Sequence, residues 1–343
     1  MEGLSGIREP TVIVVTESSQ VYDARRQALD LAAGQNWDET SAGKLAILVT
    51  EAGTNLVKHA RQGEILIGAC QRHGHNGIEV LAFDRGPGIE HVEACLKDGY
   101  SSAGTPGTGL GAISRLADEF DIYSQLGKGT SLVARLYPPK SGQIEPNGNG
   151  AMHIGTVRMP GRGERECGDN WGWRVLDDRT AVMIADGLGH GPDAAKASSA
   201  AIAVFEAAKD LTPAVLLERV HMALQPTRGA AVAIASIDPN ANQLRFAGVG
   251  NISALIVQPM TAQHLVSHNG TAGHNIRKIH EFTYDWSPNA ALVMHSDGIN
   301  THWRMDTYPG LARRHPTLLA ATLLRDQSRG HDDACVVVAR NAK

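Results

Sequence analysis

The sequence has few cysteines and lacks the common patterns in which cysteine and histidine bind zinc. Its four cysteines form no CxxC pair, and none of its 15 histidines falls in an HExxH motif. Scattered cysteines of this kind are typical of reduced thiols that pack inside a cytoplasmic protein. These absences argue against a disulfide scaffold and against a zinc enzyme.

The sequence also lacks long apolar runs and an excess of positive charge. No run approaches the roughly 18 apolar residues needed to span a bilayer, and the N-terminus shows no signal-peptide pattern. The net charge of −4 argues against a general nucleic-acid or anionic-membrane surface. We therefore expect a cytoplasmic protein with no nucleic-acid and no membrane partner.

The chain is long enough for two globular domains. It has 343 residues, of which 42% are hydrophobic and 20% charged. A stretch rich in proline, glycine and asparagine at residues 139–150 is typical of a linker. We expect one domain at residues 1–138 and a second at residues 151–343.

In the second half, carboxylates stand at the ends of apolar segments that are typical of buried strands. Asp186 ends the run Ala181–Gly187, Asp297 follows Ala290–Met294, and Asp332 precedes another run. Asp169 is a further candidate. A carboxylate at the tip of a buried strand is costly unless it has a partner, so these residues predict one divalent-metal cluster. Oxygen ligands favour Mg²⁺ or Mn²⁺ over zinc.

In the first half, one predicted helix carries polar residues on a single face. The helix covers about residues 42–60, and Glu51, Asn55 and His59 follow one another at intervals of four, with Lys58 adjacent. The alternative interpretation is a solvated polar stripe, since the opposite face of this helix is apolar.

Glycine-rich segments follow that helix. A hairpin is expected from strands at 64–70 and 78–83 around a turn at 73–77, and its second strand ends in DRGPG. The segment 104–111, GTPGTGLG, precedes a helix expected at 112–119, and GKGT at 127–130 precedes a strand at 131–136. Glycine-rich backbone at a helix N-terminus approaches phosphates closely, but neither cluster is specific alone.

In this order, the three motifs ExxxN, DxGxG and GTGLG resemble the GHKL (Bergerat-fold) ATP-binding family over about residues 10–138. The resemblance implies an α/β sandwich that binds ATP with Mg²⁺. It implies that Asp84 binds the adenine amino group with support from Thr130, that Asn55 holds Mg²⁺, and that Glu51 is the general base. The remaining expected nucleotide contacts are Lys58, His59, Gly86, Gly88, Gly107, Gly109 and Gly111.

Within this family, the compact form is similar to the anti-sigma-factor serine kinases of the RsbW/RsbT type. No histidine precedes Glu51, whereas a histidine kinase would need a phosphoacceptor histidine in a preceding helical hairpin. The resemblance implies phosphorylation of a serine or threonine on a small STAS-domain protein, with Glu51 accepting the hydroxyl proton.

The second half resembles the SpoIIE/RsbX branch of the PPM-type serine/threonine phosphatases, which have an αββα sandwich. The resemblance rests on the order of GDNW, ADGLGHG, SDG and HDDA over about residues 150–340. It implies two Mn²⁺ or Mg²⁺ ions shared by Asp186 and the carbonyl of Gly187, with Asp169 on one ion and Asp297 and Asp332 on the other. We interpret Asp333 as a supporting or surface residue, and His190 as a structural loop residue rather than a general acid.

The two resemblances together predict a bifunctional kinase and phosphatase in a bacterial partner-switching pathway. The expected partner is a STAS-domain protein, with a sigma factor or a stressosome-like complex as further candidates and a homodimer as a candidate assembly. Two alternatives remain open. The first domain could capture a partner with ATP bound but transfer no phosphate, or it could serve the phosphatase only as an ATP sensor.

Overall fold

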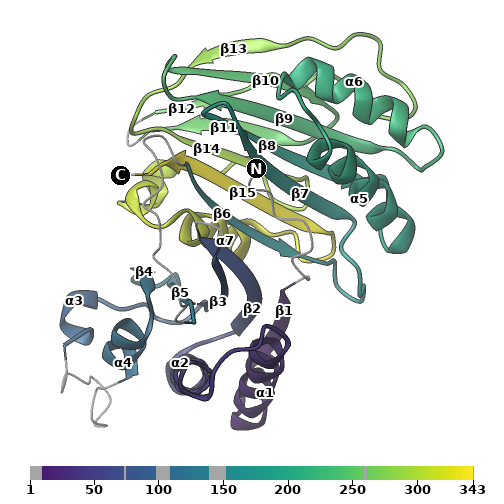
Figure 1. The fold of residues 1–343 in the computed structure, drawn as a ribbon. Helices are drawn as coiled ribbons and strands as arrows, with labels where there is room; N and C mark the ends of the chain where they lie inside the picture. The colour runs from purple at the N-terminus through teal and green to yellow at the C-terminus, as the bar shows by residue number, and fades with distance from the viewer. Residues whose placement is uncertain (1–9, 73–74, 98–108, 139–151, 259–260, 343) are drawn as a thin grey trace. The chain divides into compact units, whose positions relative to one another are not determined.

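The structure, a computed structural model, describes residues 10–72, 75–97, 109–138, 152–258 and 261–342. The chain divides into two compact α+β units, one spanning Gly6–Asn147 and the other containing Gly148–Lys343 (Figure 1). The expected linker at 139–150 lies outside the described residues. None of the helices in the described ranges has the length and hydropathy that a membrane crossing requires.

The N-terminal unit is one five-stranded antiparallel sheet with helices on one face. The strands lie in the order β1-β2-β3-β5-β4, and α1, α2 and α4 pack on the apolar face of the sheet. In chain order the elements are β1 (Thr11–Val15), α1 (Ser18–Gly34), α2 (Glu39–His59), β2 (Gly63–Arg72), β3 (His75–Phe83), α3 (Val92–Cys95), α4 (Gly109–Leu116), β4 (Glu119–Gln125) and β5 (Gly129–Leu136).

Alternation along the strands explains why the helices cover this face. Ile65, Ile67, Val80 and Ala82 are buried on it, and their neighbours in the sequence point to the opposite face. The helix α2 contributes its apolar side to the same core, so its polar side remains at the edge of that core.

Two predicted elements in this unit exist but have other bounds than expected. The helix expected at 112–119 is α4, which begins at Gly109 and ends at Leu116, and Glu119 instead begins the strand β4. The side chain of Arg135 pairs with Glu119 and Glu79, so tertiary contacts with β5 draw this segment into the sheet. The expected turn at 73–77 is also too long, because His75, Asn76 and Gly77 already belong to β3.

The C-terminal unit is a sandwich of two five-stranded sheets with helices outside them. The first sheet has the order β13-β10-β9-β8-β7 and is covered by α5 and α6, and the second has the order β12-β11-β14-β15-β6 and is covered by α7 (Figure 1). Apolar residues of both sheets, including Ile184, Phe246, Met294 and Val337, form the core between them.

The elements of the C-terminal unit follow the predicted pattern of buried strands and flanking helices. In chain order they are β6 (Met152–Met159), β7 (Asp169–Leu176), β8 (Arg179–Gly187), α5 (Pro192–Glu206), α6 (Pro213–Leu224), β9 (Ala230–Asp238), β10 (Gln243–Val249), β11 (Ser253–Val257), β12 (Ala262–His264), β13 (Phe282–Asp285), β14 (Ala291–His295), α7 (Pro316–Gln327) and β15 (Ala334–Asn341), with short 3₁₀ helices at Met305–Thr307 and Leu311–Arg313.

The apolar segment 244–257 forms two strands that lie in different sheets. The chain leaves the first sheet after Val249 and enters the second at Ser253. Gly250 has a φ of +97°, and a Cβ there would lie 2.4 Å from the Cβ of Ala231. The glycines in this stretch therefore mark a crossing between sheets, which requires a backbone conformation and a close approach that glycine permits.

Candidate functional site

The helix α2 places the first set of candidate residues. It begins after Asp38, whose carboxylate accepts hydrogen bonds from the backbone N–H and the hydroxyl of Ser41 at 3.0 and 2.6 Å. With its start fixed and its apolar side in the core, the helix holds Glu51 and Asn55 half-buried, one turn apart on one face.

The first residue of α4 lies against these two side chains. A Cβ on Gly109 would be 3.0 Å from Oε2 of Glu51 and 3.2 Å from Oδ1 of Asn55, so the structure brings all three together. Lys58 and His59, in the last turn of α2, are exposed. A small residue at this position of α4 leaves space beside the two polar groups.

The amide of Asn55 has an unmet hydrogen-bonding requirement. Its Nδ2 is buried and has no hydrogen-bond partner among the described residues. A buried polar atom of this kind is costly, and a phosphate or a hydrated cation beside it would meet the need, with the amide oriented to suit. Gly111 is buried in α4, whereas Gly107 lies outside the described residues.

A second part of this site is the loop after β3. The backbone N–H of Asp84 donates to the carbonyl of Thr130 at 2.9 Å, and Oδ1 of Asp84 accepts from the N–H of Gly86 at 2.6 Å. Gly88 has a φ of +75°, and a Cβ there would lie 2.3 Å from the carbonyl oxygen of Gln125. The loop thus requires glycine at position 88 and holds the Asp84 side chain in one orientation.

The sequence analysis missed Ser124, which ties this loop to the neighbouring strands. Its hydroxyl accepts from the N–H of Ile89 at 2.7 Å and lies 2.8 Å from the hydroxyl of Thr130. Thr130 therefore contacts Asp84 through its backbone, while its side chain contacts Ser124. Ser124 was missed because the sequence pattern did not predict β4, the strand on which it lies.

In the C-terminal unit, two candidate carboxylates face each other across neighbouring strands. Asp169 and Asp186 are direct partners in the register of β7 and β8. The side chain of Asp169 is buried and that of Asp186 is half-buried. Oδ2 of Asp169 accepts from the hydroxyl of Ser296 at 2.6 Å, and that hydroxyl accepts from the N–H of Cys335 at 2.9 Å.

The electrostatics of this pair are unfavourable without a cation. Burial raises the pKa of Asp186, and the charges of Asp169, Asp297 and Asp332 raise it further. Burial also raises the pKa of Asp169, although the hydrogen bond from Ser296 acts in the opposite direction. Both carboxyl groups therefore resist ionisation in the protein alone, as expected for like charges held together in a low-dielectric site.

The other two carboxylates lie on adjacent loops. Asp297 follows β14, and its Oδ2 accepts from Nδ2 of Asn251 at 2.6 Å. Asp332 precedes β15, and a Cβ on Gly298 would lie 2.0 Å from the carbonyl oxygen of Asp333, so the two loops touch. Burial and the charge of Asp332 raise the pKa of Asp297. Asn251 was not predicted, because it lies in the crossing between two sheets, next to Asp297 only once the strands are paired.

The buried pair fits a divalent cation in one testable respect. Oδ1 of Asp169 is buried and has no hydrogen-bond partner among the described residues, so a carboxylate oxygen is left for a ligand. Within the described ranges, no three His, Cys, Asp or Glu side chains are already arranged to hold a metal ion. The residues therefore supply the oxygen donors that Mg²⁺ and Mn²⁺ prefer, and binding would require them to converge further.

Asp333 is buried, which excludes the surface interpretation. Its Oδ1 accepts from the N–H of Gly161 and its Oδ2 from the N–H of Gly168, both at 2.8 Å. It therefore closes the loop that leads into Asp169. An anionic carboxylate that accepts two buried N–H groups is a strong constraint on that loop.

Two ion pairs flank the loop after Asp186. Nδ1 of His190 lies 2.7 Å from Oε1 of Glu164, and Nη2 of Arg228 lies 2.7 Å from Oδ2 of Asp193. His190 is largely exposed and paired, in agreement with a structural role in the loop. The sequence analysis did not single out Arg228, although the residue next to it, Gly229, accepts a backbone hydrogen bond from Leu188.

Comparison with known proteins agrees with this division of the chain. The model of the histidine kinase-like ATPase domain matches residues 14–136, and that of stage II sporulation protein E (SpoIIE) matches residues 176–342. The serine/threonine-protein kinase RsbT of Bacillus subtilis (strain 168) is 31% identical over 114 residues, which are 33% of this chain and 86% of RsbT. The chain belongs to the histidine kinase-like ATPase family and also carries a SpoIIE-type phosphatase domain.

Two solved structures are similar to little more than half of this chain. One, described as "The bacterial stressosome: a modular system that has been adapted to control secondary messenger signaling", is 27% identical, with a TM-score of 0.51, and the match covers 55% of this chain and 100% of that one. The structure of RsbX in complex with magnesium is 22% identical, with a TM-score of 0.50, and the match covers 58% of this chain and 99% of that one. The second likeness concerns the fold alone.

Proposed function

We propose that this protein both adds and removes phosphate on a serine or threonine of a STAS-domain protein in a partner-switching pathway. The observation that carries the proposal is the presence in one chain of two separate sites. One is the cluster of Glu51, Asn55 and Gly109, and the other is the facing pair Asp169 and Asp186. The family match to a kinase-type ATPase domain and a SpoIIE-type phosphatase domain supports this pairing of activities.

In the kinase reaction, Glu51 acts as the general base. It accepts the proton of the substrate hydroxyl as the oxygen forms a bond to the γ-phosphorus and the bond to the β-phosphate oxygen breaks. Asn55 would hold Mg²⁺ or a phosphate oxygen, consistent with the unmet hydrogen-bonding requirement of its amide. Asp84, held by its contacts to Thr130 and Gly86, would accept the adenine amino group. The glycine-rich start of α4 allows phosphates to approach the backbone.

In the phosphatase reaction, the carboxylates Asp169, Asp186, Asp297 and Asp332 and the carbonyl of Gly187 would hold two Mg²⁺ or Mn²⁺ ions. When bound, such ions supply hydroxide near neutral pH and stabilise charge on the phosphoryl oxygens. Ser296 orients Asp169, and Asp333 fixes the loop before it. Arg228 lies against Gly189 in the loop after Asp186 and would attract the anionic substrate in competition with Asp193, its present partner.

The RsbT relative and the similar structure described as a bacterial stressosome favour a STAS-domain partner over a small-molecule substrate. A sigma factor, a stressosome-like assembly and a second copy of the chain are the other partners that we propose to test. Because unregulated activities would together only hydrolyse ATP, we expect the partner to favour one activity at a time.

The test uses the full chain, labelled ATP and a candidate STAS-domain protein. We expect label on the STAS protein with Asp186→Asn, none with Glu51→Gln, and removal of label when the Glu51→Gln protein is added with Mn²⁺. Capture of the STAS protein at equal stoichiometry without label would instead identify a binding module. An effect of ATP on phosphatase rate without label would identify an ATP sensor.

A further inference from the structure

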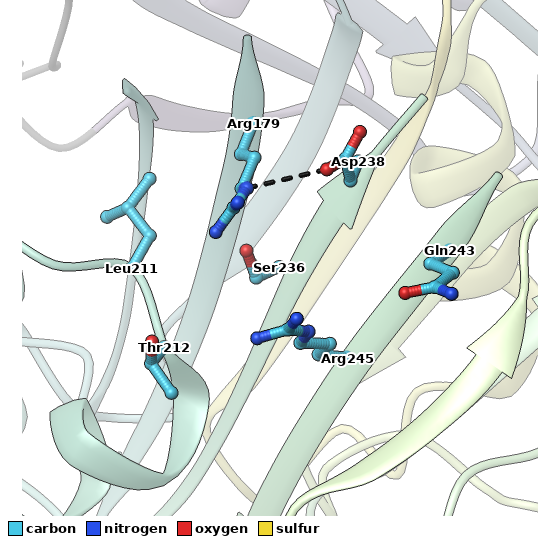
Figure 2. A pocket seen from close by; sticks show the side chains of 7 residues that line it. All are labelled: Arg179, Leu211, Thr212, Ser236, Asp238, Gln243 and Arg245. Atoms are coloured by element: carbon cyan, nitrogen blue, oxygen red, sulfur yellow. Dashed lines mark ion pairs between the residues drawn. The ribbon is translucent and has the colours of Figure 1, made fainter. Parts of the chain in front are cut away.

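The C-terminal unit has a small pocket far from its carboxylate pair. The pocket lies at the end of the first sheet where β8 and β10 begin, β9 ends and α6 starts, whereas Asp186 lies at the other end of β8. Asp186 lies seven positions after Arg179, which corresponds to about 23 Å along a strand. Figure 2 shows the residues that line the pocket: Arg179, Leu211, Thr212, Ser236, Asp238, Gln243 and Arg245.

The strand register explains why these side chains meet. Ser236 on β9 is the direct partner of Arg245 on β10 and of Ala181 on β8. Partners in register point to the same face, and Ala181 belongs to the core beneath α5 and α6. Arg179 lies two residues before Ala181, so it points to the same face. Figure 2 shows Ser236 between the two arginines, with Thr212 on the side of α6.

Most N–H donors of the Arg179 and Arg245 guanidinium groups lack an acceptor among the described residues. Nε of Arg179 lies 3.4 Å from Oδ2 of Asp238, and Nη1 of Arg245 lies 3.9 Å from Oε1 of Glu281. The first is a long contact through one nitrogen, and the second is beyond hydrogen-bond distance. Each guanidinium carries five N–H donors, so most of them have no acceptor among the described residues. Both side chains are about half exposed, at 47% and 43%.

The hydroxyl of Ser236 adds an independent signal. The residue is only 5% exposed, yet it lines the pocket, and its hydroxyl is not among the buried polar atoms that lack a hydrogen-bond partner in the described part of the chain. A hydroxyl that reaches the pocket can donate a hydrogen bond to an anion held there. The 12-residue helix α6 begins after Thr212 on the same side, and carboxylates already accept hydrogen bonds there: Glu281 from the N–H of Ala214 at 3.1 Å and Asp210 from the N–H of Thr212 at 2.9 Å.

We propose that this pocket binds one small tetrahedral oxyanion, either inorganic phosphate or the phosphoryl group of a phosphoserine. Two guanidinium groups and a hydroxyl approach it from different directions, which suits a tetrahedral anion better than a planar carboxylate. Asp238 and Glu281 offset the formal charge of the two guanidinium groups, so the site favours a single small anion over a polyanion. The proposal requires neither the kinase nor the phosphatase activity.

The experiment measures binding of inorganic phosphate to metal-stripped full-length Asp186→Asn protein, without nucleotide. This background removes the carboxylate pair as a phosphate site. The readouts are the line width of the phosphorus resonance and the side-chain Nε–H resonances of arginine. We expect saturable binding that Arg245→Gln weakens roughly tenfold or more, and Ser236→Ala by several-fold. Arg304→Gln is the matched control, because Arg304 is exposed and pairs only locally with Asp306.

A parallel titration with free phosphoserine distinguishes the two sources of the anion, and acetate tests the preference for a tetrahedral group. Tighter binding of phosphoserine would indicate docking of a phosphoprotein, and tighter binding of inorganic phosphate would indicate a site for the free ion. The proposal is overturned if phosphate binding is unsaturable, if Arg179→Gln and Arg245→Gln together leave it unchanged, or if acetate binds equally well. Because these substitutions are at partly exposed residues, circular dichroism would verify that each variant folds.

Discussion

The two candidate sites are both proposed to act on phosphoryl groups, but they are built differently: one on the face of a helix, the other on buried strands. In the N-terminal unit, Glu51 and Asn55 lie half-buried on a helix face, and the backbone of Gly109, the first residue of α4, lies close to them. In the C-terminal unit, Asp169 and Asp186 lie on neighbouring strands of a two-sheet core, where burial raises the pKa of both. Without its ligand, the first site leaves one buried amide nitrogen, on Asn55, without a partner among the described residues, whereas the second holds buried carboxylates together until a cation compensates them.

This difference predicts how tightly each activity depends on single residues and on metal. Loss of a residue from the buried site should affect both catalysis and the stability of its unit. Loss of a residue from the helix-face site should affect catalysis alone.

The largest effect is expected for Asp186→Asn. Removing one carboxylate from the pair should lower phosphatase activity roughly a thousandfold or more, because bound metal supplies several kcal/mol of transition-state stabilisation. The initial rate of phosphoryl transfer, measured with labelled ATP, should be unchanged, while label on the STAS-domain protein should persist because its removal is lost. The control is Asp306→Asn, in which an exposed carboxylate paired with Arg304 is lost. Retention of phosphatase activity in Asp186→Asn would show that Asp186 does not hold the metal.

Glu51→Gln should lower phosphoryl transfer about a hundredfold to ten-thousandfold, the usual contribution of a general base. ATP affinity and the melting temperature should change little, because Glu51 is half-buried and the amide has nearly the same shape. Equilibrium binding of ATP and a single-turnover transfer assay separate the two quantities. Glu39→Gln, at the start of the same helix, is the control. A large loss of ATP affinity would contradict the assignment of Glu51 as a base.

Metal removal should destabilise the C-terminal unit and leave the N-terminal unit unchanged. Since the pKa of Asp186 is raised in the fold above its unfolded value, ionisation opposes folding in metal-free protein. The stability of the metal-free unit should therefore fall as pH rises above about 4, where an ordinary aspartate ionises. Added Mn²⁺ should reverse this trend.

The variant Asp186→Asn sharpens that test. In metal-free protein at neutral pH, it should be more stable than the original chain by roughly 1–3 kcal/mol, because Asp186 must take up a proton on folding whereas the amide is neutral in both states. Thermal unfolding with and without a chelator measures both effects. Equal destabilisation of both variants by the chelator would show that the metal is bound elsewhere.

Asp333→Asn tests whether Asp333, which closes the loop leading into Asp169, affects stability and metal affinity. The amide presents a donor to one of the N–H groups of Gly161 and Gly168, so one buried hydrogen bond to a charged group is lost, at a cost of about 1.5–3 kcal/mol. Metal affinity should fall about 10–100-fold, as is usual when a residue that positions a ligand is changed. Calorimetric titration with Mn²⁺ measures the affinity, and unchanged affinity would limit Asp333 to a structural role.

Much of this architecture could be predicted, because each signal was local. The apolar run ending at Asp186 is one strand with its carboxylate near the end, and Asp38 caps its helix as its position before that helix predicts. The missed residues act over long distances in sequence. Ser296 contacts Asp169 across 127 positions, and the pattern SDG draws attention to Asp297 instead. A hydroxyl within a run of buried residues gives no sequence signal until the strands are paired.

The unpredicted strand β4 leads to the smallest expected effect. In Ser124→Ala, the N–H of Ile89 and the hydroxyl of Thr130 lose their partner, so the loop that begins at Asp84 is held less firmly. Because the net contribution of one hydrogen bond is about 0.5–1.5 kcal/mol, ATP affinity should fall roughly two- to tenfold. Ser19→Ala on α1 is the control, since its hydroxyl contacts only the nearby Glu17. Phosphatase activity should not respond to Ser124→Ala. A change in phosphatase activity would show that the two sites are coupled. The helix-face site and the buried carboxylate site could then not be treated as independent.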